Sequence, residues 1–171
     1  MMSSFPSARG RMLNRSPGQM YGCSRGCLEA HASGTAIAER AMELMQQNGD
    51  APLARYLREQ RLPVSAASIA QAARSGVPEA IELYRSAGHY LGRAFSFAAN
   101  LFNFGAVIVG GGVSLSMELW LPAAQDVFRR SVIHETNRNM PILATGLGYE
   151  AGLKGAAALA FHYRAKTGGS E

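Results

Sequence analysis

Two segments of this chain have the composition of a short strand, and glycines follow both. Residues 106–109 (AVIV) precede three glycines, and residues 141–144 (PILA) precede the turn at 146–148 (GLG). The first run is fully apolar and β-branched, which is typical of a strand that is covered on both faces. Two short strands do not form a stable open sheet by themselves. We therefore expect the rest of the sheet to come from residues outside this chain or from a partner chain, and interpret the chain as a fragment.

Helical periodicity occupies most of the remaining sequence. Helices are predicted over residues 33–48, 65–74, 78–103, 116–133 and 151–165. Ser65 is the expected N-cap of the second helix. Pro78 stands in the first turn of the third, where its missing N–H costs nothing. Near the C-terminus the order is strand, glycines, helix, strand, glycines, helix, which predicts α/β organisation.

The helix over residues 78–103 is the longest and is predicted to lie in the core. Its small residues, including Ala87, Gly88 and Gly92, would let a second helix approach closely. Six of its apolar residues are expected to share one buried face: Ile81, Tyr84, Leu91, Phe95, Ala98 and Phe102.

The composition is that of a globular domain, with 47% hydrophobic and 17% charged residues in a chain of 171. No apolar run approaches the roughly 18 residues of a membrane span, and no signal sequence is recognisable, so we expect a cytoplasmic protein without a membrane partner. The net charge is +5, but no run of lysines and arginines accompanies it, and nucleic-acid binding is not favoured. The two cysteines indicate a small thiol site or reduced thiols rather than a disulfide framework.

The turn Gly110–Gly112 allows two interpretations. Three glycines after a buried strand let a ligand come close to the backbone, and the free N–H groups of such a turn bind anions. Alternatively, the glycines only provide a tight turn. The segment is not a dinucleotide fingerprint, because the G-x-G-x-x-G spacing is absent and no helix is predicted to open directly from the glycines.

Four ordered blocks of sequence resemble one known family. Residues 22–35 (GCSRGCLEAHASGT) are similar to the zinc-loop segment of the ROK family (repressors, open reading frames and kinases). Residues 90–92 (YLG) match its long-helix motif, and residues 103–114 are similar to its N-P-x-x-I-V-I-G-G-G-V-S motif. Residues 147–157 (LGYEAGLKGAA) are similar to its L-G-D-D-A-G-L-x-G-A-A motif.

This resemblance implies a glucokinase-like sugar kinase of the actin and hexokinase type (ribonuclease H-like), with ATP bound between two lobes. The chain would be its C-terminal lobe, helix-rich with an incomplete sheet, and Gly110, Gly111 and Gly112 would approach the nucleotide. Residues 1–32 would be a degraded zinc and sugar loop, and residues 33–171 the nucleotide-side lobe. The family's D-x-G-G-T phosphate loop and catalytic aspartate lie in its N-terminal half, and neither is expected in these 171 residues.

The zinc loop departs from the family pattern. Alignment on residues 26–29 (GCLE) places the family's first two cysteines at Met20 and Gly22. A separate alignment of Gly10 and Arg11 with the family's Gly-His pair places its zinc-binding histidine at Arg11. Zinc is therefore not expected at an intact four-ligand site. Cys27 and Cys23 remain candidate metal ligands, as a C-x3-C pair that His31 would complete, although a surface role is the more ordinary interpretation of that histidine.

Glu29 keeps the position of a sugar-contacting carboxylate in the family, and a carboxylate accepts hydrogen bonds from two hydroxyls of a polyol. Without the resemblance, it would be interpreted as a solvated first-turn glutamate. The second sugar-contacting glutamate of the family falls on Ala8. The carboxylate of Glu29 is therefore the one that we assign to sugar binding.

The resemblance implies transfer of phosphate from ATP with Mg²⁺ to a hexose or amino-hexose hydroxyl, and this chain by itself is expected to be inactive. Its expected partners are the sugar, ATP, and either a missing N-terminal lobe or a second copy in a homo-oligomer such as a dimer. One alternative is the sugar-sensing lobe of a ROK transcriptional repressor, which would carry an N-terminal helix-turn-helix. Another is a decayed ROK protein without catalytic activity.

Overall fold

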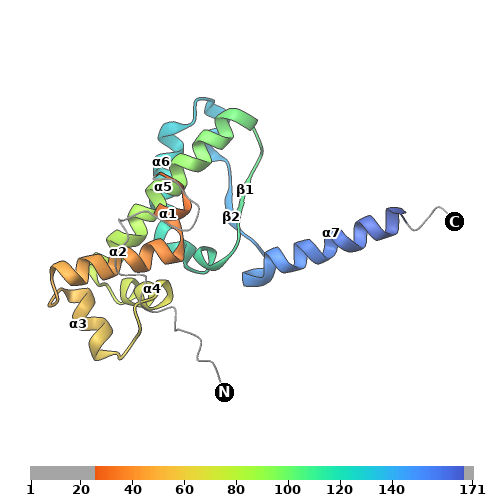
Figure 1. The fold of residues 1–171 in the computed structure, drawn as a ribbon. Helices are drawn as coiled ribbons and strands as arrows, with labels where there is room; N and C mark the ends of the chain where they lie inside the picture. Colours follow the sequence, from red (N-terminus) through yellow and green to blue (C-terminus); the bar gives the residue numbers. More distant parts are fainter. Residues whose placement is uncertain (1–25, 168–171) are drawn as a thin grey trace, which may run out of the picture.

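The computed structural model of the protein describes residues 26–167. Its helices and strands follow one another as α1 (Glu29–Ala32), α2 (Gly34–Gln47), α3 (Pro52–Glu59), α4 (Ala66–Arg74), α5 (Pro78–Phe102), β1 (Val107–Val109), the 3-10 helix η2 (Gly112–Ser116), α6 (Met117–Ser131), the 3-10 helix η3 (Glu135–Asn139), β2 (Ile142–Ala144), the 3-10 helix η4 (Gly148–Glu150) and α7 (Ala151–Thr167). The first six α-helices form one body, and α7 extends away from it (Figure 1).

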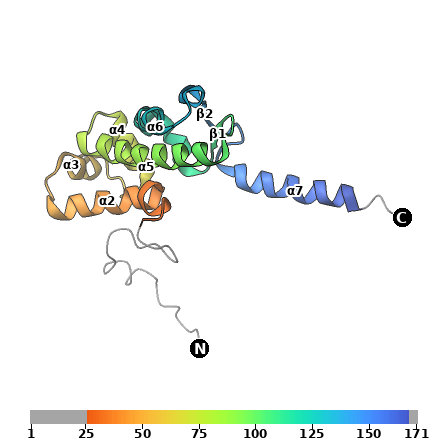
Figure 2. The ribbon, with the colours of Figure 1, turned by 90° about the horizontal axis from the view of Figure 1, so that it is seen from above.

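The long helix α5 is the centre of the helical body, as its sequence predicts. In the view of Figure 2, α2 and α6 lie on opposite sides of it. The predicted close approach of a second helix is confirmed at Gly88 and Gly92, which face α6. A Cβ atom at Gly88 would lie 2.3 Å from the carbonyl oxygen of Trp120, and one at Gly92 would lie 2.4 Å from that of Ala124. The two backbones are therefore in direct contact.

The predicted apolar face of α5 is correct only in part. Tyr84 and Leu91 are buried, but Ile81 and Phe102 are 44% and 74% exposed. The residues that α5 turns toward its neighbours are mostly small, including Ala80, Ala87 and Ala99. Close backbone packing needs small side chains at the contact, and the larger ones at Ile81 and Phe102 are displaced to the surface.

Local capping signals account for several helix ends. The side chains of Ser33 and Ser65 accept hydrogen bonds from the backbone N–H groups of Ala36 (3.1 Å) and Ser68 (3.2 Å), and α2 and α4 begin at these caps. The sequence did not predict α3. Its first residue is Pro52, and its buried face consists of Leu53, Ala54 and Leu57.

The sheet consists of β1 and β2, which are parallel, with Val107 opposite Ile142 and Val109 opposite Ala144. The chain crosses between them through η2, α6 and η3, so this part of the molecule has the predicted helix-rich α/β organisation. The expectation that β1 is covered on both faces is wrong for the described residues, because Ile108 is 70% exposed. Among residues 26–167, no helix or strand covers the face of β1 that carries Ile108.

Helix α7 confirms the predicted alanine-rich C-terminal helix, but its surroundings were not foreseen. In both views it points away from the other helices (Figures 1 and 2). Large apolar side chains on it are exposed, among them Leu153, Leu159 and Phe161. No helix among the described residues is both long enough and apolar enough to span a bilayer.

Candidate functional site

The glycine turn lies at the carboxyl end of β1, beside the corresponding end of β2. The N–H of Thr145 donates a hydrogen bond of 2.9 Å to the carbonyl oxygen of Val109, which joins the two strands where the turn begins. A Cβ at Gly110 would lie 3.4 Å from Cγ2 of Thr145 and 3.7 Å from Cβ of Ala151. The loops that follow both strands thus share one edge of the sheet, the place where α/β proteins bind ligands.

This turn is open to solvent. Gly110 and Gly112 are exposed, and a Cβ at Gly111 would have no neighbouring atom within 4 Å. Gly111 has φ of 81°, a backbone conformation that other residues adopt only with strain. A short 3-10 helix begins at Gly112, whereas the sequence predicted no helix directly after the glycines. The first N–H groups of a helix have no intrahelical acceptor and can bind an anionic group.

Buried side chains hold the far side of this turn. The hydroxyl of Ser114 donates a hydrogen bond of 2.7 Å to the carbonyl oxygen of Gly111. The indole Nε1–H of Trp120 donates one of 2.9 Å to the carbonyl oxygen of Val113. Ser114 and Trp120 are both buried, so these bonds are shielded from competing water. They hold the turn's carbonyl groups toward the protein.

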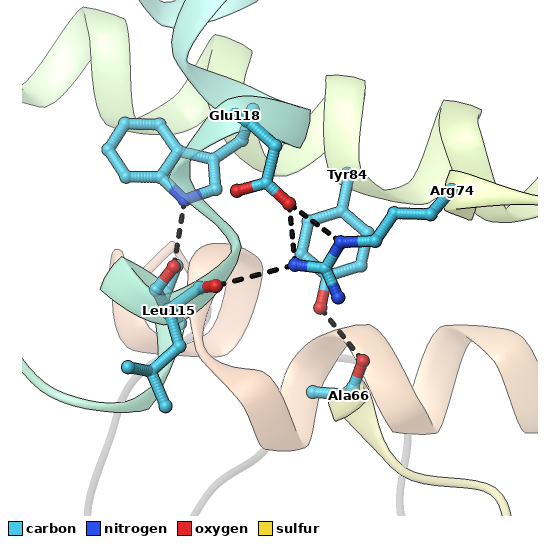
Figure 3. A network of polar contacts seen from close by, with 7 residues as sticks. Ala66, Arg74, Tyr84, Leu115 and Glu118 are labelled. Carbon is cyan, nitrogen blue, oxygen red and sulfur yellow. Dashed lines mark hydrogen bonds and ion pairs between the residues drawn. The ribbon is translucent and has the colours of Figure 1, made fainter. Parts of the chain in front are cut away.

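A polar network connects α4 to the same segment (Figure 3). Arg74 donates to the Glu118 carboxylate through Nε at 2.8 Å and through Nη2 at 2.5 Å, and it reaches the carbonyl oxygen of Leu115 at 3.4 Å. The two side chains of the ion pair are about half exposed, 48% and 54%, so water weakens their attraction. The arrangement serves chiefly to fix where η2 ends and α6 begins.

Beneath this network the Tyr84 hydroxyl donates a hydrogen bond of 2.8 Å to the carbonyl oxygen of Ala66, at the start of α4 (Figure 3). Burial raises the pKa of Tyr84 above its ordinary value, because the ionised form loses its hydration, and a hydrogen bond with Ser116 opposes this effect only in part. Tyr84 therefore joins α4, α5 and the end of η2 as a neutral phenol.

Glu29 is the first residue of α1 and is exposed. Its carboxylate has no hydrogen bond or ion pair with another residue of the range 26–167. Helix α1 packs against α2 and α5. The structure thus brings the three predicted glycines together with the loop after β2, and it places Glu29 on a separate element.

A cluster beside Glu29 was not predicted from the sequence. His31 is half-buried, and its ring stacks on that of Tyr90 with centroids 4.3 Å apart and planes 13° from parallel. Nη2 of Arg40 lies 2.7 Å from Nδ1 of His31, and the guanidinium carbon of Arg40 lies 5.4 Å from the centre of the Tyr90 ring. These residues come from α1, α2 and α5, and no local sequence pattern links them.

The described residues do not fit a zinc site. Cys27 is half-buried with a free thiol, while Cys23 lies outside the described residues, as do Ala8, Arg11, Met20 and Gly22. Within residues 26–167 there is no group of three or more histidine, cysteine or acidic side chains that could hold a metal ion. The Nδ1 atom of His31 is already used by Arg40. Residues 26–167 therefore do not by themselves provide a four-ligand zinc site.

The molecule is an α/β protein, with parallel strands, helices around them, and a glycine turn at the carboxyl edge of the strands. Residues 10–162 match the ROK family, and the chain belongs to that family. Its structural neighbours include ROK sugar kinases, which have the actin-like ATPase fold, and a ROK family transcriptional regulator. A ROK family glucokinase from Streptomyces griseus, in complex with glucose and AMPPNP, superposes with a TM-score of 0.68 at 35% identity, covering 80% of this chain and 45% of that one.

Curated relatives include both enzymes and regulators. The glucokinase of Streptomyces coelicolor is 33% identical over 147 residues, which is 84% of this chain and 46% of that protein. The DNA-binding transcriptional dual regulator NagC of Escherichia coli is 27% identical over 131 residues, which is 75% of this chain and 30% of that protein. The chain thus spans less than half of the length of these relatives.

Proposed function

We propose that this chain forms the nucleotide-side, C-terminal half of a ROK sugar kinase of the glucokinase or amino-sugar kinase type. The observation that carries the proposal is the open glycine turn at the shared carboxyl edge of β1 and β2. In support, the similar glucokinase from Streptomyces griseus was crystallised with glucose and AMPPNP. The reaction would be transfer of the γ-phosphoryl group of ATP to a hexose hydroxyl.

In this proposal the N–H groups of Gly110, Gly111 and Gly112 face the phosphates or ribose of the nucleotide, and Glu29 accepts hydrogen bonds from sugar hydroxyls. Residues 1–32 belong to the sugar loop, and residues 33–171 to the nucleotide-side lobe. The D-x-G-G-T motif does not occur in these 171 residues. A further stretch of polypeptide must then supply the phosphate loop and the base, and the assembled kinase would act in the cytoplasm, where ATP is available.

Two exposed apolar surfaces support a further stretch of this kind. One is the outer face of β1 at Ile108, and the other is α7 with Leu153, Leu159 and Phe161. A helix that carries apolar residues around its whole circumference is typical of a buried position. Ile108 lies just before the glycine turn in the chain, and α7 begins beside the turn, since a Cβ at Gly110 would lie 3.7 Å from Cβ of Ala151. A second lobe would cover both surfaces where it closes over the nucleotide.

Nucleotide binding to the purified chain tests the proposal. Titration with AMPPNP should show saturable binding, and Gly111→Val should weaken it by about tenfold or more, because valine strains a positive φ. Gly105→Val is the matched control, since Gly105 also has open space around it but no positive φ. Absence of binding by the unaltered chain, or equal effects of the two variants, would overturn the proposal.

A sugar-responsive regulator is the second candidate function, and the similarity to NagC over 75% of the chain favours it. A regulator would bind sugar without needing nucleotide, whereas a kinase half would bind nucleotide at the glycine turn. The DNA upstream of the Met1 codon gives an independent distinction. A D-x-G-G-T segment there, in any frame, would support the kinase, and a helix-turn-helix segment would support the regulator.

A further inference from the structure

We propose that His31, Arg40 and Tyr90 form a clamp that positions Glu29 for sugar binding. These three are positioning residues, because none of them is assigned a contact with the sugar. The inference rests on the proposed function of Glu29 and adds the residues on which that function depends.

Helix α1 cannot hold its own position. It has four residues and no side-chain cap at its N-terminus, and an isolated helix of this length is not stable in water. Only contacts with the rest of the protein can fix it. Two of its alanines, Ala30 and Ala32, are buried with 5% exposure each, but a methyl group resists sliding and rotation poorly. The polar and aromatic contacts of His31 fix the orientation of α1 on α2 and α5.

Within the clamp, Tyr90 and Arg40 contact the His31 ring from two directions. Tyr90 of α5 lies against the face of the imidazole ring, and Arg40 of α2 reaches its edge at Nδ1. An arginine can only donate hydrogen bonds, so Nδ1 must accept and the ring carries its proton on Nε2. Nη1 of Arg40 also lies 3.4 Å from Oγ of Ser86 on α5. The guanidinium group of Arg40, on α2, therefore contacts both α1 and α5.

The geometry of a helix explains why this clamp leaves Glu29 free. Residues two positions apart on a helix do not share a face. With His31 held against Tyr90, Glu29 is directed elsewhere, and the structure places it in solvent. A carboxylate that must bind two hydroxyls needs a fixed position more than it needs burial. Loosening the clamp would therefore weaken sugar binding without touching the carboxylate.

Amide hydrogen exchange and glucose titration, on the full chain, test this proposal together. His31→Phe keeps an aromatic ring for stacking but removes the acceptor, and Arg40→Met removes the donor. Both should speed exchange of the backbone N–H groups of residues 30–33 by about tenfold, the loss expected for one hydrogen bond. Exchange in α2 and α5 should stay unchanged. His31→Asn, which keeps an acceptor near the position of Nδ1, should behave more like the unaltered chain than His31→Phe does.

Arg85→Met is the matched control, because Arg85 is an exposed arginine on α5 that pairs with Glu82 of the same helix. It should leave both measurements unchanged. Glucose affinity should fall by about tenfold in His31→Phe and in Arg40→Met. Unchanged exchange at residues 30–33 would overturn the clamp, and unchanged glucose affinity with faster exchange would overturn its positioning role. Failure of the unaltered chain to bind glucose, with exchange as expected, would instead overturn the assignment of Glu29.

Discussion

Tyr84 shows how a single side chain joins several elements around the glycine turn. Its ring is almost completely buried at 2% exposure, and its hydroxyl donates to the carbonyl oxygen of Ala66. A buried phenol that donates a hydrogen bond must keep its proton. The burial that stabilises the packing of α4 on α5 therefore also disfavours ionisation at this position.

The folded protein should consequently become less stable in alkaline solution, where Tyr84 of the unfolded chain ionises first. Because its pKa is raised in the folded state, the stabilisation is complete below the unfolded value of about 10 and decreases as the pH rises above it, by up to about 1.4 kcal/mol per pH unit. Tyr84→Phe should lower the unfolding free energy at neutral pH by about 1 kcal/mol and remove this alkaline component. Urea unfolding of both proteins from neutral to alkaline pH measures the difference. Parallel pH profiles would contradict the interpretation.

Residue-level chemistry was only partly visible in the sequence. The glycine turn could be located because glycines directly after an apolar run are a local pattern, and the structure shows those glycines in an exposed turn. The contact of His31 with Tyr90 could not be predicted, because the two residues lie far apart in the sequence, on α1 and α5. Glu29 could be selected from the family resemblance alone, and its role stays a prediction.

At the scale of elements, α5 and α6 pack with their backbones in direct contact. It depends on Gly88 and Gly92, where added atoms would meet backbone rather than flexible side chains. Backbone atoms cannot move aside one at a time, so the two helices would have to separate. This contact also sets the position of Trp120, and through it the position of η2.

Gly88→Ala should therefore destabilise the protein by about 2–3 kcal/mol, the cost of overpacking a well-packed site. The added Cβ would lie 2.3 Å from a carbonyl oxygen of Trp120 and 3.0 Å from Cβ of Ala123. Gly155→Ala on α7 is the control, with nothing within 4 Å of its Cβ, and it should be neutral or stabilising by up to about 1 kcal/mol. Thermal unfolding compares them. A similar loss in both variants would show that the contact with α6 is not responsible, because the substitution by itself favours the helix.

Helix ends with a chemical signal were predictable, and elements without one were not. Ser33, Ser65 and Pro78 mark starts that the structure confirms. Helix α3 was missed because it is short and polar on most sides, although Pro52 and the spacing of Leu53 and Leu57 provided a usable pattern. The exposure of Ile108 was also unforeseen, because an apolar strand gives no information on whether its covering layer belongs to the same polypeptide.

At the scale of the whole molecule, the described chain contains a helical body and only a small part of a sheet. The chain covers 45% of the similar Streptomyces griseus glucokinase structure and superposes over 80% of its own length. Apolar surface on α7 and β1 remains uncovered within residues 26–167. Several large exposed apolar side chains on one element, as on α7, are typical of an interface.

We expect the 171-residue chain alone to show no sugar kinase activity. Phosphoryl transfer needs a base, a metal-bound triphosphate and a sugar in one cleft, and the base alone contributes about 10²- to 10⁴-fold. These residues contain no D-x-G-G-T phosphate loop. A coupled assay of ADP release with glucose, N-acetylglucosamine, N-acetylmannosamine or fructose should therefore remain at background. Sugar-dependent turnover that Glu29→Gln abolishes would prove this expectation wrong.

Trp120 is the only tryptophan in the sequence, is completely buried, and binds the carbonyl oxygen of Val113 just after the glycine turn. The chain consequently carries a natural fluorophore at the place where its proposed ligand would enter. Indole emission depends on polarity and on hydrogen bonding, so unfolding would move the emission toward the red. Rearrangement of the turn would change its intensity. A fluorimeter can follow both events in the unlabelled protein.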